Sequence, residues 1–281
     1  MRKPKALFLI RVGHMLIPNS ARHAFIDLLE GKAGLDLTVD EDYAELTPER
    51  LGGYDVILSC AGGSLMRYRG GRSVREANDA EVSALLDAIE RGKPFIGLHC
   101  ASLMFINQLY YRQPLSQAVR RAGPDDLLQM FQVRFLEMVG NAVLEWPDDP
   151  RPNNLLTDTQ LRYIEMIGLN FVTDDGLEDT QVRIVDREHP ITRGVDDFVI
   201  YDECYHMVGD RSKLHVLAEA KGWPLAWHHR WGDGKVHYNA LGHDHSGVTH
   251  PSYQRMVVNA VDWALERSGA PTEARAVELV R

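Results

Sequence analysis

Short apolar runs alternate with amphipathic segments along the first part of the chain, and this alternation constrains the fold most. Lys5–Ile10, Val56–Cys60 and Phe95–Leu98 are almost wholly apolar, which is typical of strands buried on both faces of a sheet. Between the last two runs, Asn78 opens a segment whose apolar residues recur at helical spacing up to Ile89. Strands that alternate with helices in this way favour a parallel sheet with helices on both faces.

The second part of the chain has a different pattern. Further strands are expected at 182–185, 198–201, 214–218, 225–228 and 235–241, and the tight turn Trp231–Gly234 predicts that the last two form an antiparallel hairpin. The alternation of strand and helix patterns is interrupted at about 110–163, where helical patterns dominate. We therefore expect one α/β domain over residues 1–281 with a helical insertion there, which would act as a lid, as an oligomer contact or only as a decoration.

Charge and cysteine usage narrow the range of partners. The net charge is −9 and no basic stripe is visible, which argues against nucleic acid as a partner. Cys60, Cys100 and Cys204 are widely spaced and form no CxxC pair, which fits a cytoplasmic protein. No run approaches the roughly 20 apolar residues that a membrane span needs, so no membrane partner is expected.

Several polar residues follow the predicted parallel strands, at the sheet edge where ligands usually bind. His14 follows the run Lys5–Ile10, Gly62 and Gly63 follow Val56–Cys60, and His99 and Cys100 follow Phe95–Leu98. An abrupt change from strand to helix would expose His99 beside the backbone amides of a helix start. The alternatives are a packed histidine at an ordinary strand–helix junction and a plain glycine turn.

Two further clusters lie in the second part of the chain. Asp202-Glu203-Cys204-Tyr205 follows one predicted strand, and His243 and His245 form an H-x-H pair where the last strand ends. Asp202 can simply cap a turn. Placing the Glu203 carboxylate at a strand end near His99 would remove it from water at an energetic cost, and this cost favours a functional role for Glu203.

At these residues the sequence resembles the trehalose-utilisation (ThuA-like) family, a branch of the class I glutamine-amidotransferase-like superfamily. The resemblance extends over most of residues 5–267. It implies a flavodoxin-like core extended by antiparallel strands, and a sugar or oxidised sugar as substrate. The matching segments are Gly97–His99, His189–Gly194, Asp202–Tyr205, Pro224–Trp227, Gly234–Tyr238, Ala240–Asp244, Pro251 and Asp262–Ala264.

The chain also departs from the amidotransferase pattern. An amidotransferase would have a cysteine at the strand–helix turn, where this chain has His99, and Cys100 comes one position later. We therefore expect no glutamine amidotransferase activity. A nucleophilic role for Cys100 is a weaker alternative, because a free cysteine is commonly a small buried apolar residue.

The residues favour acid–base chemistry on a sugar or keto-sugar, by isomerisation or hydrolysis, without a nucleotide cofactor. An imidazole can take and give a proton near neutral pH, and Glu203 would orient His99. Tyr205 or Trp227 would supply a ring face for the sugar, although a tryptophan is more often a core residue. His14, Gly62 and Gly63 would contribute to substrate binding.

Two other functions fit the same residues. His243, His245 and Asp202 could hold a divalent metal, most plausibly Zn²⁺, that would activate water or polarise a carbonyl. The other alternative is a sugar-binding or assembly protein without catalysis. A small-molecule carbohydrate is the expected ligand in each case, and the insertion would suit a homo-oligomer contact.

Overall fold

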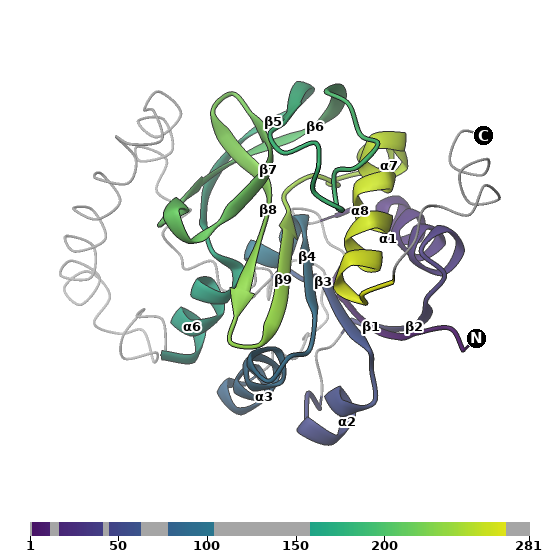
Figure 1. Ribbon diagram of the computed structural model, residues 1–281, viewed down its shortest axis with the longest axis vertical. Helices are drawn as coiled ribbons and strands as arrows, with labels where there is room; N and C mark the ends of the chain where they lie inside the picture. The colour runs from purple at the N-terminus through teal and green to yellow at the C-terminus, as the bar shows by residue number, and fades with distance from the viewer. Residues whose placement is uncertain (1, 12–16, 42–44, 63–77, 104–157, 268–281) are drawn as a thin grey trace, which may run out of the picture.

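A single sheet of nine strands organises the part of the chain that the structure describes (Figure 1). The computed structural model describes residues 2–11, 17–41, 45–62, 78–103 and 158–267. The strand order in the sheet is β2-β1-β3-β4-β9-β8-β7-β5-β6. The strands are β1 (Lys5–Ile10), β2 (Asp36–Asp40), β3 (Val56–Cys60), β4 (Phe95–Leu98), β5 (Asn170–Ile184), β6 (Phe198–Val208), β7 (His215–Ala220), β8 (Trp223–Trp231) and β9 (Gly234–Asn239).

Five neighbouring strands, β2, β1, β3, β4 and β9, run parallel and form the core of the sheet. All residues of β3 and β4 are buried, as their apolar sequences predict. Figure 1 shows α1 and α8 on one face of these strands and α3 on the other. This confirms the predicted α/β fold with helices on both faces of a parallel sheet. The helices are α1 (Asn19–Asp27), α2 (Pro48–Gly52), α3 (Asp79–Glu90), α6 (Asp158–Ile167), α7 (His245–Thr249) and α8 (Pro251–Ala264).

The helix α3 begins where the sequence predicts it. The Asn78 side chain accepts a hydrogen bond from the Glu81 backbone at 3.0 Å, and the Glu81 carboxylate accepts one from the Asn78 backbone at 2.9 Å. This reciprocal cap satisfies two backbone amides that the helix itself leaves unpaired. It fixes the start of the helix that leads directly into β4.

The antiparallel strands extend the sheet beyond β9. The predicted hairpin is confirmed, with Trp231 paired to Gly234 at the β8–β9 turn. The prediction for β5 is too short, because the strand runs for 15 residues from Asn170 instead of starting at 182. Its first part carries acidic residues and Gly176 at φ +76°, and it is held by pairing with β6, which a local apolar pattern does not reveal.

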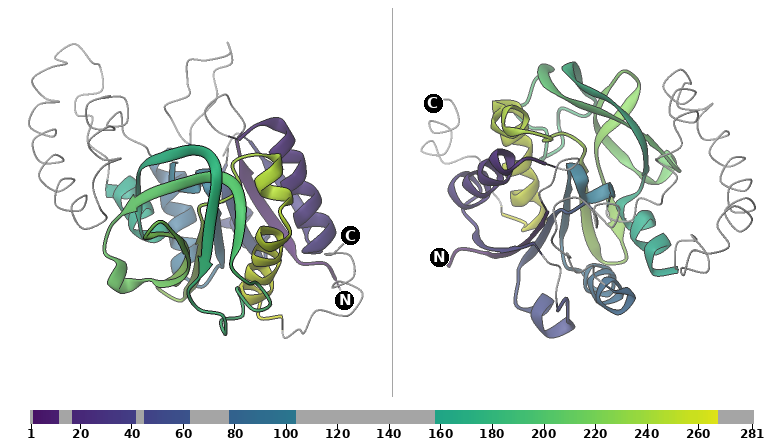
Figure 2. Two further views of the ribbon diagram at one scale, coloured as in Figure 1. Left: turned by 90° about the horizontal axis from the view of Figure 1, so that it is seen from above. Right: turned by 180° about the vertical axis from the view of Figure 1, so that it is seen from behind.

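The predicted insertion at about 110–163 lies largely outside the described residues, and only α6 belongs to its end. None of the described helices combines the length and the apolar character that crossing a membrane requires. Figure 2 shows the sheet from above and from behind, with β5 and β6 beyond the carboxyl ends of β4 and β9. This arrangement brings residues of β6 to the edge where His99 lies.

Candidate functional site

His99 occupies a sharp turn between β4 and a short 3₁₀ helix, His99–Leu103. Its φ of +38° is unusual for a residue with a side chain and has a cost of about 1 kcal/mol or more. Tyr238 supports this turn from the neighbouring strand β9, because its hydroxyl donates a hydrogen bond to the His99 carbonyl at 2.7 Å. Gly97 permits the close approach, since a Cβ there would lie 2.9 Å from the Tyr238 ring.

Hydrogen bonds fix the tautomer of His99. Its Nδ1 lies 2.7 Å from the Ala240 carbonyl, which can only accept, so Nδ1 carries the proton. The neutral ring therefore presents an Nε2 lone pair, to which the Tyr205 hydroxyl donates at 2.8 Å. Burial, followed by the charge of the nearby His243, lowers the pKa of His99 to about 3. His99 is thus a neutral imidazole at physiological pH.

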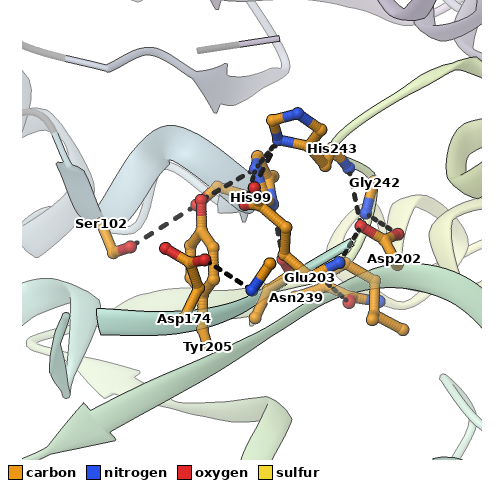
Figure 3. Close-up of polar contacts among 12 residues, drawn as sticks. His99, Ser102, Asp174, Asp202, Glu203, Tyr205, Asn239, Gly242 and His243 are labelled. Atoms are coloured by element: carbon orange, nitrogen blue, oxygen red, sulfur yellow. Dashed lines mark hydrogen bonds and ion pairs between the residues drawn. The ribbon is translucent and has the colours of Figure 1, made fainter. Parts of the chain in front are cut away.

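Glu203 and His243 complete the cluster around Nε2 of His99 (Figure 3). Glu203 Oε2 lies 3.3 Å from His243 Nδ1 and 3.6 Å from His99 Nε2, and His243 Nδ1 lies 3.2 Å from His99 Nε2. Burial acts to lower the pKa of His243, but its hydrogen bond to Glu203 and the charge of that carboxylate raise it overall. The two histidines therefore have pKa values displaced in opposite directions.

The cluster is reachable from solvent at one side. The side chains of Glu203 and His243 are 17% and 19% exposed, whereas His99 is 1% exposed. Glu203 and His243 are consequently the groups that a small molecule can contact directly, and His99 forms the inner wall of the site.

Asp202 has a positioning role. Its fully buried carboxylate accepts hydrogen bonds from three backbone N–H groups, those of Glu203, Gly242 and His243, at 2.9, 2.7 and 3.1 Å. Burial raises its pKa to about 6, even though these donors favour the charged form. Asp202 therefore ties the start of the Glu203 segment to the loop that carries His243.

The structure places the remaining predicted residues at different distances from this cluster. Cys100 is fully buried, and burial, followed by contact with Cys60, raises its pKa well above the usual value. Trp227 is also fully buried, with Nε1 donating to the Ile167 carbonyl at 2.9 Å, so it presents no ring face to solvent. His245 is exposed at the start of α7, and Gly62 is buried after β3. His14 and Gly63 lie outside the described residues.

The sequence alone assigned no role at the site to three residues that support His99: Ala240, Tyr238 and Ser102. The Ser102 and Tyr238 hydroxyls lie 2.8 Å apart, and together with Ala240 they hold the main chain and ring of His99. Their roles depend on the parallel pairing of β4 with β9, in which Gly97 lies opposite Tyr238. No local motif signals that pairing.

His99, Glu203 and His243 could also hold a metal ion. Each offers one ligand atom, and these atoms all lie within 4.8 Å of one another. Two imidazole nitrogens and one carboxylate oxygen form a common ligand set for catalytic Zn²⁺. A histidine ligand usually donates its second ring N–H to a carbonyl or carboxylate, as His99 does to Ala240.

Comparison with known proteins gives a family context. Residues 154–264 match the ThuA family model, described as trehalose utilisation. No curated protein matches the sequence.

Among solved structures, a ThuA-like protein of Bacteroides uniformis has a similar fold, with a TM-score of 0.60, 16% identity, and coverage of 95% of this chain and 94% of that one. A Salmonella typhimurium protein described as cytoplasmic gives a TM-score of 0.55, 15% identity, and coverage of 92% and 99%. A β-galactosidase of Bacillus circulans gives 0.51 at 12% identity, with 93% of this chain covering 31% of the enzyme. Residues 154–264 thus match the ThuA family model, and the fold of the described residues is similar to that of ThuA-like structures.

Proposed function

We propose that the protein is an enzyme of carbohydrate metabolism that isomerises or hydrolyses a sugar or keto-sugar by acid–base catalysis, with Glu203 as the base and His243 as the acid. The observation that carries the proposal is the position of Glu203 between two histidines whose pKa values move apart. A carboxylate and a histidine whose pKa it raises can divide the roles of base and acid, while a neutral second histidine fixes their geometry.

The division of roles follows from protonation and exposure. Glu203 would accept a proton from a carbon next to the substrate carbonyl, or from water in a hydrolysis. His243, protonated beside Glu203, would donate one to the developing oxyanion or to the leaving oxygen. His99 has too low a pKa to act as an acid near neutrality. Its neutral Nε2 would instead fix the geometry of the pair.

A divalent ion is the alternative use of the same residues. His99 Nε2, His243 and Glu203 would hold it, and the ion, in place of the Glu203–His243 pair, would supply polarisation of a substrate carbonyl or of water. Zn²⁺ suits the two nitrogens and one oxygen. Because His243 must lose its proton to bind an ion, loading would release a proton and weaken at low pH.

The substrate class rests on the family context. The matching family is described as trehalose utilisation, and one structure with the same fold belongs to a chain named β-galactosidase. A cytoplasmic location is part of the proposal, supported by three buried free cysteines and by the Salmonella protein described as cytoplasmic.

Hydrogen–deuterium exchange tests the proposed chemistry. Keto-glycosides and their parent sugars would be incubated with the protein in D₂O, and solvent exchange at the carbon beside the carbonyl would be followed by proton NMR together with isomer and hydrolysis products. We expect turnover by the wild type and a loss of about 10²-fold or more in Glu203→Gln and His243→Gln. His245→Gln is the matched control, because His245 is exposed two residues from His243.

Two outcomes would overturn the catalytic proposal. Equal turnover in Glu203→Gln and wild type would show that this cluster does not catalyse the reaction. Tight binding of a sugar without turnover, lost in the same variants, would support the non-catalytic alternative. Elemental analysis of the purified wild type and of His243→Ala would test the metal alternative: one ion per chain fewer in the variant than in the wild type would favour a metal centre at this site, and equal metal content would favour the acid–base pair.

A further inference from the structure

A second cluster of potential ligands lies on the opposite face of β6. Successive side chains of a strand point to opposite faces, so Glu203 and Tyr205 face His99 while Cys204 and His206 face away. Cys204 Sγ lies 3.9 Å from the Ala220 carbonyl, and the ring of His206 stacks on Trp223. Cys204 and His206 therefore belong to a separate environment, between β6 and the end of the β7–β8 hairpin.

Asp175 of the neighbouring strand β5 completes this cluster. Its Oδ1 lies 3.0 Å from His206 Nε2, and the ligand atoms of Asp175, Cys204 and His206 all lie within 4.8 Å of one another. The Lys221 ammonium lies 2.8 Å from the other oxygen of Asp175, Oδ2. Lys221 thus engages one carboxylate oxygen and leaves Oδ1 facing the thiol and the imidazole.

The histidine in this cluster is buried and only partly satisfied. His206 is 5% exposed; its Nε2 faces the Asp175 carboxylate, and its Nδ1 has no hydrogen-bond partner among the described residues. Buried polar atoms are nearly always satisfied, and a missing ion is one explanation when they are not. The Trp223 ring, 4.5 Å from the His206 ring centroid and inclined by 10°, holds the imidazole in place.

We propose that Asp175, Cys204 and His206 bind a divalent transition-metal ion of the Zn²⁺ class, with the Cys204 thiolate as the distinguishing ligand. One sulfur, one nitrogen and one oxygen form a three-ligand set that leaves a fourth position for water. The charges around the cluster support this: Asp175 and Glu178 both contact the one cation Lys221, and Asp174 adds a further negative charge near Cys204. A dication would reduce this excess of negative charge.

Protonation links ion binding to pH at this second site. Burial, followed by the nearby Asp175 carboxylate, raises the pKa of the Cys204 thiol to about 12, so the thiol is protonated when no ion is present. An ion would displace that proton and take the sulfur as a thiolate. This inference does not depend on the proposed enzymatic function, because the two sites share no ligand and only this one contains sulfur.

Cobalt(II) is the probe that separates the two sites. A Co²⁺–thiolate bond gives an intense near-ultraviolet charge-transfer band that nitrogen and oxygen ligands do not give. We expect this band when the full-length His243→Ala protein, which lacks the first site, is titrated with Co²⁺. Cys204→Ser in that background should abolish the band, and His206→Gln should weaken Co²⁺ binding by about 10-fold or more. Cys100→Ser is the matched control, and it should keep the band.

No band at any Co²⁺ concentration, or a band that survives in Cys204→Ser and disappears in Cys100→Ser, would overturn the proposal. If Cys204→Ser fails to fold by circular dichroism, X-ray absorption of the Zn²⁺-loaded His243→Ala protein decides. A sulfur neighbour at about 2.3 Å is expected, and a shell of only nitrogen and oxygen would contradict the assignment.

Discussion

Two groups of histidines in this protein show that clustering alone does not make a reactive site. His99 and His243 meet around the carboxylate of Glu203 at the carboxyl edge of the parallel strands. His189, His215 and His228 instead stack ring on ring between β7, β8 and the end of α8, with centroids 4.4 to 5.5 Å apart. The difference between them lies in where the negative charge is placed.

In the stack the carboxylate lies at the rim. The Asp186 carboxylate contacts the ring of the half-exposed His215 at 2.8 Å, and its other oxygen accepts hydrogen bonds from the backbone N–H groups of Glu188 and His189. Burial, and then repulsion from the neighbouring histidines, lowers the pKa of His228 to about 4, and burial also lowers the pKa of His189. In the first cluster, by contrast, Glu203 raises the pKa of His243. The central carboxylate raises the pKa of its histidine, while the peripheral one leaves the buried rings with lowered pKa values.

The largest effect is expected from Glu203→Gln. Without the central charge, the pKa of His243 should fall and turnover should drop by about 10²- to 10⁴-fold. Asp186→Asn, which removes the peripheral carboxylate, should leave turnover unchanged. NMR titration of the His243 ring together with kcat would check both effects. An unchanged His243 pKa in Glu203→Gln would contradict the claim that the central carboxylate sets the pKa of His243.

Acid should unfold the protein through its neutral buried histidines. Burial lowers the pKa of His237 to about 3, and His228 beside it also has a lowered pKa. The unfolded chain takes up a proton near pH 6.5, whereas the folded ring takes none until much lower pH. The contribution of such a histidine to the free energy of unfolding is therefore fully present above pH 6.5. It is lost as pH falls below 6.5, by about 1.4 kcal/mol per pH unit for a fully buried ring such as His237.

Denaturant unfolding at pH 7 and pH 5 would measure this loss. His237→Gln should lower stability at pH 7 but show a smaller drop between the two pH values than the wild type. His245→Gln, at an exposed position, should show the wild-type drop. An identical pH dependence in all three proteins would rule out His237 as a source of the effect.

Gly97→Ala should destabilise the protein by about 1–3 kcal/mol through overpacking. The added Cβ would lie 2.9 Å from Tyr238 and 3.3 Å from Ala101, so the support under His99 would have to shift. Gly31→Ala is the control, since a Cβ there meets nothing within 4 Å. Thermal unfolding with kcat would show whether geometry at His99 is coupled to activity, and equal melting temperatures in the two variants would contradict the packing argument.

The smallest effect is expected from Asp186→Asn on stability. The Asp186–His215 contact is largely exposed, with side chains 30% and 49% accessible, and such pairs contribute about 1 kcal/mol or less. Urea unfolding near neutral pH should detect little change. A loss of several kcal/mol would mean that the rim carboxylate holds the histidine stack together.

The sequence determined the parallel core and the position of His99. Short apolar runs identified β1, β3 and β4 within their observed bounds, because strands buried on both faces leave little choice of residue. The same runs placed His99 at a strand–helix turn. The strands and this turn are local features, so a local pattern reveals them, whereas the nearness of Glu203 to His99 was a hypothesis that only the fold could test.

Only the tertiary structure decided which residues share the site and how they are protonated. Pairing of β4 with β9 brings Ala240 and Tyr238 to His99, and β6 carries Glu203 and Tyr205 to the same place. His243 joins the cluster while His245, two residues later, remains exposed. The opposite face of β6 gathers Asp175, Cys204 and His206, which no spacing motif announces. Strand order and burial govern these outcomes, because both depend on segments that are distant in the chain.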